Sequence, residues 1–351
     1  MAGILEWLAL AVEERASDLH VTVNAPPVLR VAGRLRACGN EALEADDTER
    51  MARALLAPEQ WEILRARGEF DFSYSIPGVS RFRVNAYRQR GCYSLAARVI
   101  PAAPPAFDSL GLPAAVRRFA ERERGLVLVT GPAGSGKSTT LSALVAHINQ
   151  TQERHIITLE DPIEYLHRHG RSLIDQREIG SDTASFAAGL RAALRQDPDV
   201  LLVGEMRDLE TIATAITAAE TGHLVFATLH TPDAPQAIDR IIDVFPPGQQ
   251  QQIRVQLAGV LLGVAAQRLL PAADGRGRTV MAEVLVNTPA VANLIRTEKA
   301  HQIRTAMQTG GAYGMQTMEM SLRDLLQSRR ISEAQFRHAA AEWTAAPGRS
   351  L

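Results

Sequence analysis

The sequence has little lysine, little cysteine and no long apolar run. Only Lys137 and Lys299 are lysines, and the other 36 of the 38 basic residues are arginine. Two cysteines, Cys38 and Cys92, are too few for a disulfide framework or a four-cysteine zinc site. The longest apolar run, residues 257–266, is well short of the roughly 18 residues that cross a bilayer. We therefore expect no direct membrane span.

The charge balance also lacks an excess of either sign. The chain has 38 basic and 39 acidic residues, a formal charge of -1 and a pI near 6.8. A protein whose partner is nucleic acid usually carries clustered cations, so we expect no nucleic-acid partner. Glu6 stands where a signal peptide would carry its positive region, which predicts a cytoplasmic protein.

The composition, with 46% hydrophobic and 22% charged residues, is that of a globular protein, and 351 residues favour two domains. Four prolines within residues 101–113 predict the linker between them. We therefore expect an N-terminal domain over 1–100, a linker and leading helix over 101–124, a second domain over 125–343 and a loose tail over 344–351.

The N-terminal hundred residues predict a small α+β domain. Helical patterns cover residues 4–16 and 47–67, and strands are expected over 19–23 and 28–35. Residues 70–76 and 82–86 then alternate apolar and polar side chains around a Pro77-Gly78 turn. In the return strand Phe82 faces the core, so Arg81 and Arg83 must share the opposite face.

After the linker, short apolar runs alternate with longer helical patterns, and the last seventy residues are mostly helical in pattern. The runs cover residues 126–130, 156–159, 200–203 and 224–228. Runs without alternation indicate strands that are buried on both faces, as in a parallel sheet covered by helices. The fold class predicted for this part is α/β.

A phosphate-binding loop stands between the first of these runs and a helical pattern over 139–149. The loop fits G-x-x-x-x-G-K-[ST] and, with the residue after it, consists of Gly131, Pro132, Ala133, Gly134, Ser135, Gly136, Lys137, Ser138 and Thr139. Glycines let the backbone amides wrap a phosphate, lysine neutralises β- and γ-phosphate charge, and the serine hydroxyl ligates Mg²⁺. The motif predicts ATP and Mg²⁺ as cofactors.

The other three runs end in polar groups. Glu160, Asp161 and Glu164 follow the second run, Glu205 and Arg207 follow the third, and His230 follows the fourth. In a parallel sheet the chemistry gathers at the carboxyl ends of the strands. Carboxylates there can support Mg²⁺ and orient the attacking water. Glu164 and Glu160 both remain candidates for the catalytic base.

These residues resemble the PilT-type retraction ATPases of bacterial type IV pili, within the secretion ATPase superfamily. Four segments carry the resemblance: residues 131–140 resemble the family's Walker A loop, 158–165 its Asp box, 203–208 its atypical Walker B and 220–230 its His box. The similarity extends from Ser17 to Thr317. It implies a RecA-like P-loop ATPase domain with a smaller PAS-like N-terminal domain.

The resemblance also implies roles for residues. Lys137 and Ser138 would hold phosphate and Mg²⁺, Glu164 would be the catalytic base, and Glu205 would support the Mg²⁺ shell, partly through water. His230 and His223 would sense the nucleotide. Arginines of the N-terminal domain would reach the phosphates: Arg81, Arg83 and Arg98.

The resemblance further implies a hexameric motor that hydrolyses ATP to power pilus retraction and twitching motility. The homo-hexamer would work on an inner-membrane pilus platform protein from the cytoplasmic side of that membrane, and a paralogous accessory retraction ATPase is a further implied partner. The family's C-terminal signature differs here, because Ala292 stands in place of an arginine and Thr297 in place of an acid.

Three alternatives stay open. The chain could be a PilU-like accessory retraction ATPase, a RecA-like nucleic-acid translocase or a nucleotide-sensing module without turnover. Extension and type II secretion ATPases typically carry a four-cysteine zinc module, which two cysteines cannot build.

Overall fold

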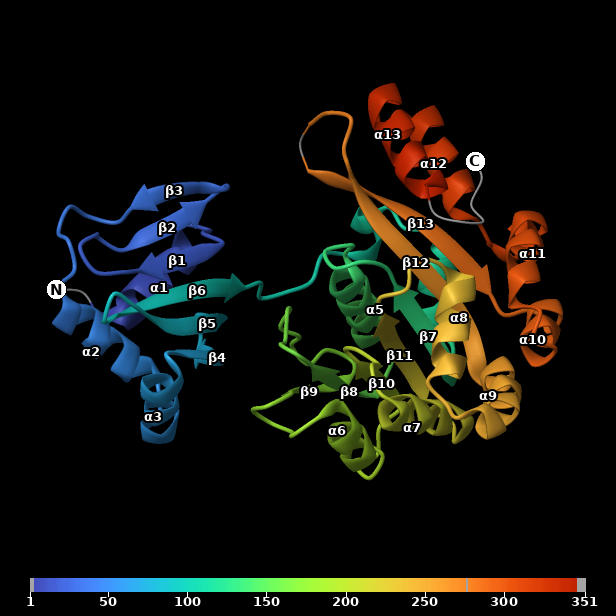
Figure 1. Cartoon of the computed structure of the whole chain (residues 1–351), viewed down its shortest axis with the longest axis horizontal. Helices are drawn as coiled ribbons and strands as arrows, with labels where there is room; N and C mark the ends of the chain where they lie inside the picture. Colours follow the sequence, from blue (N-terminus) through green and yellow to red (C-terminus); the bar gives the residue numbers. More distant parts are fainter. Residues whose placement is uncertain (1–2, 276, 346–351) are drawn as a thin grey trace. The chain divides into compact units, whose positions relative to one another are not determined.

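The computed structural model describes residues 3–275 and 277–345 and divides into two compact units (Figure 1). Unit 1 comprises Met1–Ala103 and Glu164–Leu166, and unit 2 comprises Pro104–Ile163 and His167–Leu351. The first division lies inside the predicted proline-rich linker. The tail predicted over 344–351 lies mostly outside the described residues, since only its first two residues are described and Thr344 ends a helix.

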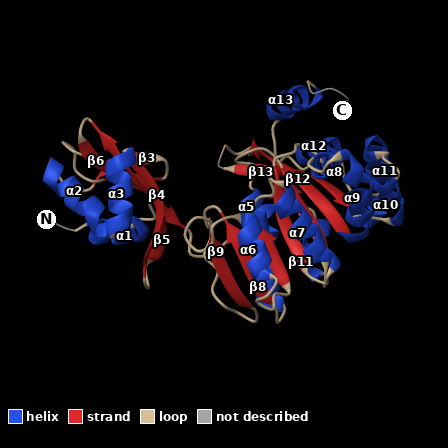
Figure 2. Cartoon of the chain, turned by 60° about the horizontal axis from the view of Figure 1, so that its bottom comes forward, coloured by secondary structure: helices blue, strands red, loops and turns tan. Residues whose placement is uncertain are grey.

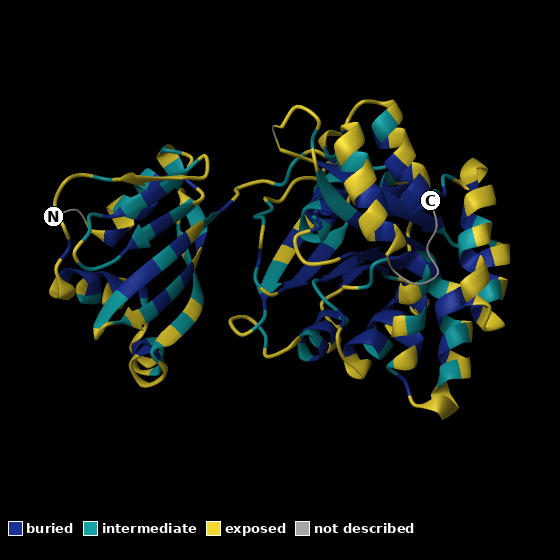
Figure 3. Cartoon of the chain, turned by 45° about the horizontal axis from the view of Figure 1, so that its top comes forward, coloured by how far each residue is buried: buried dark blue, intermediate teal, exposed yellow. Residues whose placement is uncertain are grey.

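Unit 1 is an antiparallel sheet with three helices. The strand order is β3-β2-β1-β6-β5-β4. The elements are α1 (Ile4–Glu13), β1 (Asp18–Val21), β2 (Val28–Val31), β3 (Arg34–Ala37), α2 (Ala45–Leu55), α3 (Pro58–Arg67), β4 (Glu69–Ile76), β5 (Ser80–Gln89) and β6 (Cys92–Ile100). The apolar faces of the helices and the sheet form one core, visible as the buried layer of the small unit in Figure 3.

The single strand expected over 28–35 is wrong, because the segment forms the two strands β2 and β3. Ala32 and Gly33 both adopt positive φ, 46° and 80°, which turns the chain back on itself. Val31 pairs with Arg34 directly across this turn. Gly33 is a turn signal, but the alanine before it is not among the residues that favour positive φ, so the pair does not match the usual two-residue hairpin loops.

The alternation predicted for β4 and β5 is confirmed. Phe82 and Val84 of β5 are fully buried, and Tyr74 of β4 pairs with Phe82. Arg81 and Arg83 point to the opposite face. Arg83 pairs with Arg98 of β6, so these arginines share one face of the sheet.

Unit 2 is an α/β fold around a seven-stranded sheet with the order β13-β12-β7-β11-β10-β8-β9. All neighbouring strands are parallel except β12 and β13. The strands are β7 (Gly125–Thr130), β8 (His155–Glu160), β9 (Leu173–Glu178), β10 (Val200–Val203), β11 (Leu224–Leu229), β12 (Leu261–Pro271) and β13 (Arg278–Val286). The four apolar runs form β7, β8, β10 and β11, as predicted.

The helices of unit 2 pack on both faces of this sheet, as Figure 2 shows. They are α4 (Ala114–Arg118), α5 (Lys137–Thr151), α6 (Phe186–Ala193), α7 (Leu209–Glu220), α8 (Ala234–Asp243), α9 (Pro247–Val260), α10 (Pro289–Arg296), α11 (Ile303–Thr309), α12 (Met318–Gln327) and α13 (Glu333–Thr344). In the described part of the chain, none of them has the length and apolarity that crossing a membrane requires.

The C-terminal helices form a separate small core on the β12–β13 hairpin. Trp343 of α13 is 1% exposed, and its indole nitrogen donates to the Glu319 carboxylate of α12. Met281 of β13 and Ala266 of β12 complete this core. The C-terminal helix is therefore anchored to the strand next to β7.

Candidate functional site

The phosphate loop connects the carboxyl end of β7 to the first residue of α5. Gly131, Gly134 and Gly136 all have positive φ, at 141°, 75° and 92°. A side chain at Gly131 would overlap the main-chain oxygen of Gln267, so this position needs glycine for space as well as for conformation. The loop is thus shaped as a backbone nest at the N-terminus of a 15-residue helix, where amides and helix dipole favour an anion.

Lys137 opens α5, and its side chain curls back over the loop. Its Nζ atom donates to the main-chain oxygens of Gly131 at 2.9 Å and Pro132 at 3.1 Å. Ser138 and Thr139 follow in the first turn of the helix, both half-buried. Lys137 and Ser138 therefore both lie in the first turn of the helix, directly after the nest.

Gln267 of β12 holds this loop by hydrogen bonds and is a residue of the candidate site that the sequence did not predict. Its side chain is 1% exposed; Nε2 donates to the Ser135 carbonyl at 2.8 Å, and Oε1 accepts from the Thr140 hydroxyl at 3.0 Å. One amide thereby links the loop to the helix that follows it. A buried glutamine in a strand beside a phosphate loop would have been the signal, but β12 itself was not predicted.

Glu205 follows β10 and lies among cations. Its Oε1 atom is 2.6 Å from Arg207 Nε and 3.0 Å from His230 Nε2. Burial opposes ionisation, but the hydrogen bond from Arg207 and the charges of His230, Arg207 and Lys137 outweigh it and lower the pKa of Glu205. The carboxylate is therefore ionised at neutral pH and within electrostatic reach of the phosphate-loop lysine.

Hydrogen bonds between the ends of β10 and β11 hold Glu205 and His230 side by side. The Thr228 hydroxyl donates to the Gly204 carbonyl, and the Met206 amide donates to the Thr228 carbonyl at 3.1 Å. His230 is half-exposed. The structure thus brings the phosphate loop, Glu205 and His230 together at one edge of the sheet, as predicted for strand ends.

The two candidate bases belong to different units. Glu160 ends β8 in unit 2, is 8% exposed, and accepts from the Thr158 hydroxyl at 2.6 Å and Gln176 Nε2 at 3.1 Å. Glu164 is exposed and groups with unit 1, where the Leu166 amide donates to the Pro101 carbonyl at 3.2 Å. Glu160 is thus already engaged within its own unit, whereas the Glu164 carboxylate is open to solvent.

His223 does not lie with these groups. It precedes β11, whereas His230 follows that strand, so the two histidines stand at opposite ends of it. The His223 carbonyl accepts from the amide of Gly125, the first residue of β7. Because the phosphate loop follows the last residue of β7, His223 lies at the other edge of the sheet from the loop in the same chain.

The arginine face of unit 1 is accessible. Arg98 is 69% exposed, and its Nε atom donates to the Asp18 carboxylate at 3.0 Å. Arg83 is exposed, and Arg81 donates to the Ser75 hydroxyl at 3.3 Å. Three guanidinium groups on one sheet face make a surface suited to phosphate oxygens.

The two departures in the C-terminal signature fall at α10. Ala292 is buried in the main core of unit 2, and Thr297 follows the last residue of the helix, where its hydroxyl donates to the Asn293 carbonyl at 2.8 Å. The Ala292 side chain therefore packs in the core and adds no charge to the surface of α10.

The sequence matches a family model described as type II/IV secretion system protein over residues 4–335. It is 45% identical to the type IV pilus retraction ATPase PilT of Pseudomonas aeruginosa, covering 96% of this chain and 98% of that protein. A twitching motility protein of Neisseria gonorrhoeae is 47% identical, with 90% and 84% covered. The ATPase PilU of Pseudomonas aeruginosa is 40% identical, with 91% and 83% covered.

Solved structures give the same relationship. The crystal structure of the pilus retraction motor PilT with bound ADP superposes with a TM-score of 0.90 at 45% identity and covers 99% of both chains. The ATPase DotB of Legionella pneumophila superposes at 0.79 with 27% identity, covering 97% of this chain and 96% of that one. A RecA-like ATPase unit with a smaller PAS-like α+β unit is therefore the fold, and the chain belongs to the type II/IV secretion system protein family and, within it, to the pilus retraction ATPases.

Proposed function

We propose that the chain is a motor that hydrolyses ATP as a ring of six subunits and powers type IV pilus retraction and twitching motility. The observation that carries this proposal is the position of Glu205, which follows β10 at the same end of the parallel strands as the phosphate loop with its Lys137. Such a pairing places a cation for the transferred phosphate next to a carboxylate that can support a metal ion. Similarity to the retraction ATPase over nearly the whole chain supports retraction as the movement that this motor drives.

Mg²⁺ fits the residues at this edge of the sheet. The loop amides and Lys137 would hold the phosphates, the Ser138 hydroxyl would ligate Mg²⁺ directly, and Glu205 would hold it partly through water. When bound, the ion neutralises charge that develops on the phosphate oxygens. His230, at 3.0 Å from Glu205, would report the state of that carboxylate to the start of α8.

We assign the catalytic base to Glu164 rather than to Glu160. Glu160 already accepts two side-chain hydrogen bonds, which favour its role in holding β8 and β9 together. Glu164 stands with the N-terminal unit, so a movement of that unit would carry it to or away from the nucleotide. Arg81, Arg83 and Arg98, on the same unit, would contact the phosphates in the closed state.

The motor would act on an inner-membrane platform protein of the pilus from the cytoplasmic face of that membrane. A paralogous accessory ATPase would be a further partner. The alternative, that this chain is itself the accessory ATPase, has less support, since identity to PilU is 40% against 45% to PilT. His223, at the far edge of the sheet, would meet a nucleotide only across a subunit boundary.

The first experiment measures ATP turnover of the purified chain together with its subunit count by mass photometry, for the unmodified chain and for Glu164→Ala and Glu160→Ala. We expect hexamers throughout, with a loss of turnover of about 10²–10⁴-fold for Glu164→Ala, the usual range for removing a general base. A larger loss for Glu160→Ala would move the base to Glu160. Turnover that depends on added DNA would favour the translocase, and no turnover would favour a sensor.

The second experiment tests whether the arginine face serves a neighbouring subunit. Subunits with Arg83→Ala and subunits with Lys137→Ala should each be inactive alone. Mixed rings would regain part of the activity if the arginine of one subunit reaches the nucleotide held by another. No recovery in mixed rings of confirmed composition would place both groups on the same nucleotide of one chain. Arg34→Ala, on the exposed strand β3, is the matched control and should keep full turnover.

A further inference from the structure

Glu283 of β13 is a buried acid that has no part in the proposed reaction. The residue is 3% exposed, and its Oε1 atom accepts from the amide of Ala234, the first residue of α8, at 2.8 Å. The backbone amide of Met318, the first residue of α12, also donates a hydrogen bond to this carboxyl. One side chain on a strand therefore connects the first residues of two helices.

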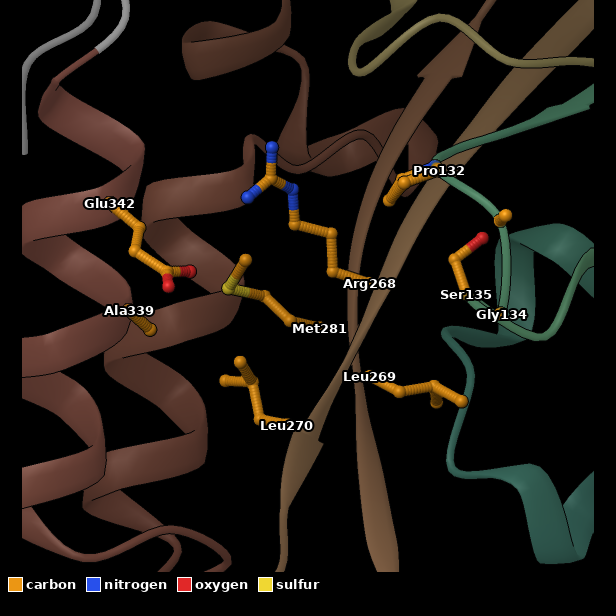
Figure 4. A pocket seen from close by; sticks show the side chains of 10 residues that line it. Pro132, Gly134, Ser135, Arg268, Leu269, Leu270, Met281, Ala339 and Glu342 are labelled. Carbon is orange, nitrogen blue, oxygen red and sulfur yellow. The ribbon is translucent and has the colours of Figure 1, made fainter.

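The strand β13 directs Glu283 toward the helices that cover this face of the sheet. Met281, two residues earlier and so on the same face of the strand, points toward Ala339 of α13 in Figure 4 and belongs to the core that α12 and α13 form on the hairpin. The Ala282 amide between them donates to the Ser321 hydroxyl of α12 at 3.0 Å. β13 is thus fixed to α12 at successive positions, and Glu283 extends this contact to α8.

The first turn of α8 needs an acceptor from outside the helix. The N-cap residue Asp233 accepts from the Gln236 amide at 3.0 Å through its own side chain, and Pro235 has no amide proton. The Ala234 amide has no acceptor within the helix, because the first amides of a helix precede any carbonyl that they could reach. Glu283 supplies that acceptor. Since a buried amide without a partner is costly, loss of this carboxyl should displace the start of α8.

The start of α8 is close in sequence to the pair formed by His230 and Glu205. Only residues 231–233 separate His230 from Ala234, and Pro232 restricts the backbone of this short link. His230 Nε2 is 3.0 Å from Glu205 Oε1. Hydrogen bonds weaken steeply when their geometry changes, so a shift at the start of α8 would weaken the contact between His230 and Glu205.

We propose that Glu283 is a positioning residue for ATP hydrolysis, which holds the start of α8 so that His230 stays beside Glu205. The inference rests on the proposed function for the roles of His230 and Glu205. Glu283 affects the rate through His230 and not by contact with the substrate. It adds a strand on the far side of the phosphate loop to the parts of the chain that determine the geometry of the site.

The test measures kcat and KM for ATP in Glu283→Gln, with Thr288→Val as the matched control. Glutamine keeps the size of the side chain but replaces one acceptor oxygen by an amino group, so it cannot accept from both amides. We expect kcat to fall about tenfold and KM to change by less than about twofold, because the phosphate loop keeps its own contacts. Thr288→Val removes the side-chain cap of another helix of unit 2, α10, and should leave both constants unchanged.

A double-mutant cycle with His230→Ala separates positioning from a purely structural role. In the His230→Ala background, Glu283→Gln should lower kcat by less than about twofold, because the group that it positions is already absent. Equal losses of kcat in the two backgrounds would overturn the proposal. A rise in KM with kcat unchanged would also overturn it.

A second variant and a second measurement guard against misfolding of the first. Asp233→Ala removes the N-cap of α8 without a change in β13 and should lower kcat with the same dependence on His230. In hydrogen exchange, the amides of residues 230–236 should exchange faster in Glu283→Gln and Asp233→Ala than in Thr288→Val. Unchanged exchange of this segment in Glu283→Gln would overturn the proposal. The exchange measurement needs no hydrolysis, so failure of the proposed function would show separately, as absent ATP turnover in the unmodified chain.

Discussion

Replacing Gln267 by methionine tests whether one buried amide holds the phosphate loop in its binding shape. Methionine keeps the length of the side chain but leaves the Ser135 carbonyl and the Thr140 hydroxyl without the partners they have at 2.8 Å and 3.0 Å. Each buried polar group left unsatisfied costs about 1–3 kcal/mol, so we expect a loss of about 2–4 kcal/mol in the free energy of unfolding after the gain in apolar contact. For a unit of this size the melting temperature should fall by about 5–15 °C.

The assay combines thermal unfolding with ADP titration, and Gln316→Met is the control. Gln316 is half-buried near the same hairpin, and its side-chain amide donates to the Ala282 carbonyl at 2.6 Å rather than to a loop residue. Both variants should lose stability, and only Gln267→Met should lose ADP affinity. A Thr140→Val variant completes a double-mutant cycle and should show coupling with Gln267. The reasoning is refuted if Gln267→Met loses stability while ADP and tripolyphosphate bind as before.

Three further predictions concern the loop, a buried acid and the Glu205 cluster. Gly131→Ala should destabilise the loop more than Gly134→Ala, because a side chain at residue 131 would overlap Gln267. A side chain at residue 134 meets open space, so that substitution should cost only about 1–2 kcal/mol for the positive φ. Chemical denaturation of both variants measures the difference in the free energy of unfolding. Burial raises the pKa of Glu283 from 4.5 to about 7, so the folded state binds the proton of this carboxyl more tightly than the unfolded state does. The melting temperature should therefore fall as the pH rises between these two values. Glu283→Gln should reduce this fall in melting curves taken over the same pH range. Arg207→Gln removes a hydrogen bond that lowers the pKa of Glu205, so the acid limb of the pH profile of ATP turnover should move to higher pH. The shift should be less than about one pH unit because Arg207 is exposed. An unmoved acid limb would show that the ionisation of Glu205 does not limit the rate in that pH range.

The sequence was most informative where chemistry and backbone conformation coincide. A segment that follows a strand, opens a helix and has glycines at 131, 134 and 136 with a lysine at 137 predicts a phosphate-binding loop with few alternatives. Buried strands β7, β10 and β11 consist almost entirely of apolar residues, so each could be predicted from an apolar run without alternation. The alternation of β5 correctly assigned its arginines to one face.

The features that escaped prediction depend on contacts distant in the sequence. Strand β9 has a mixed polar pattern because it is at the edge of the sheet, and β12 continues without a break from helix α9. Gln267 acquires its role only because β12 returns beside β7, about 130 residues after the loop that it braces. His223 and His230 lie at opposite ends of β11, although both belong to the segment 220–230 that resembles a single motif in the sequence.

The two lysines of the chain allow the most direct test of the central claim, that the loop at residues 131–138 binds and hydrolyses ATP. Lys137 contacts the loop carbonyls, and Lys299 is exposed between α10 and α11. Steady-state ATP turnover should be lost in Lys137→Ala and unchanged in Lys299→Ala, with the melting temperatures of both close to that of the unmodified chain. Equal turnover in the two variants would contradict the account.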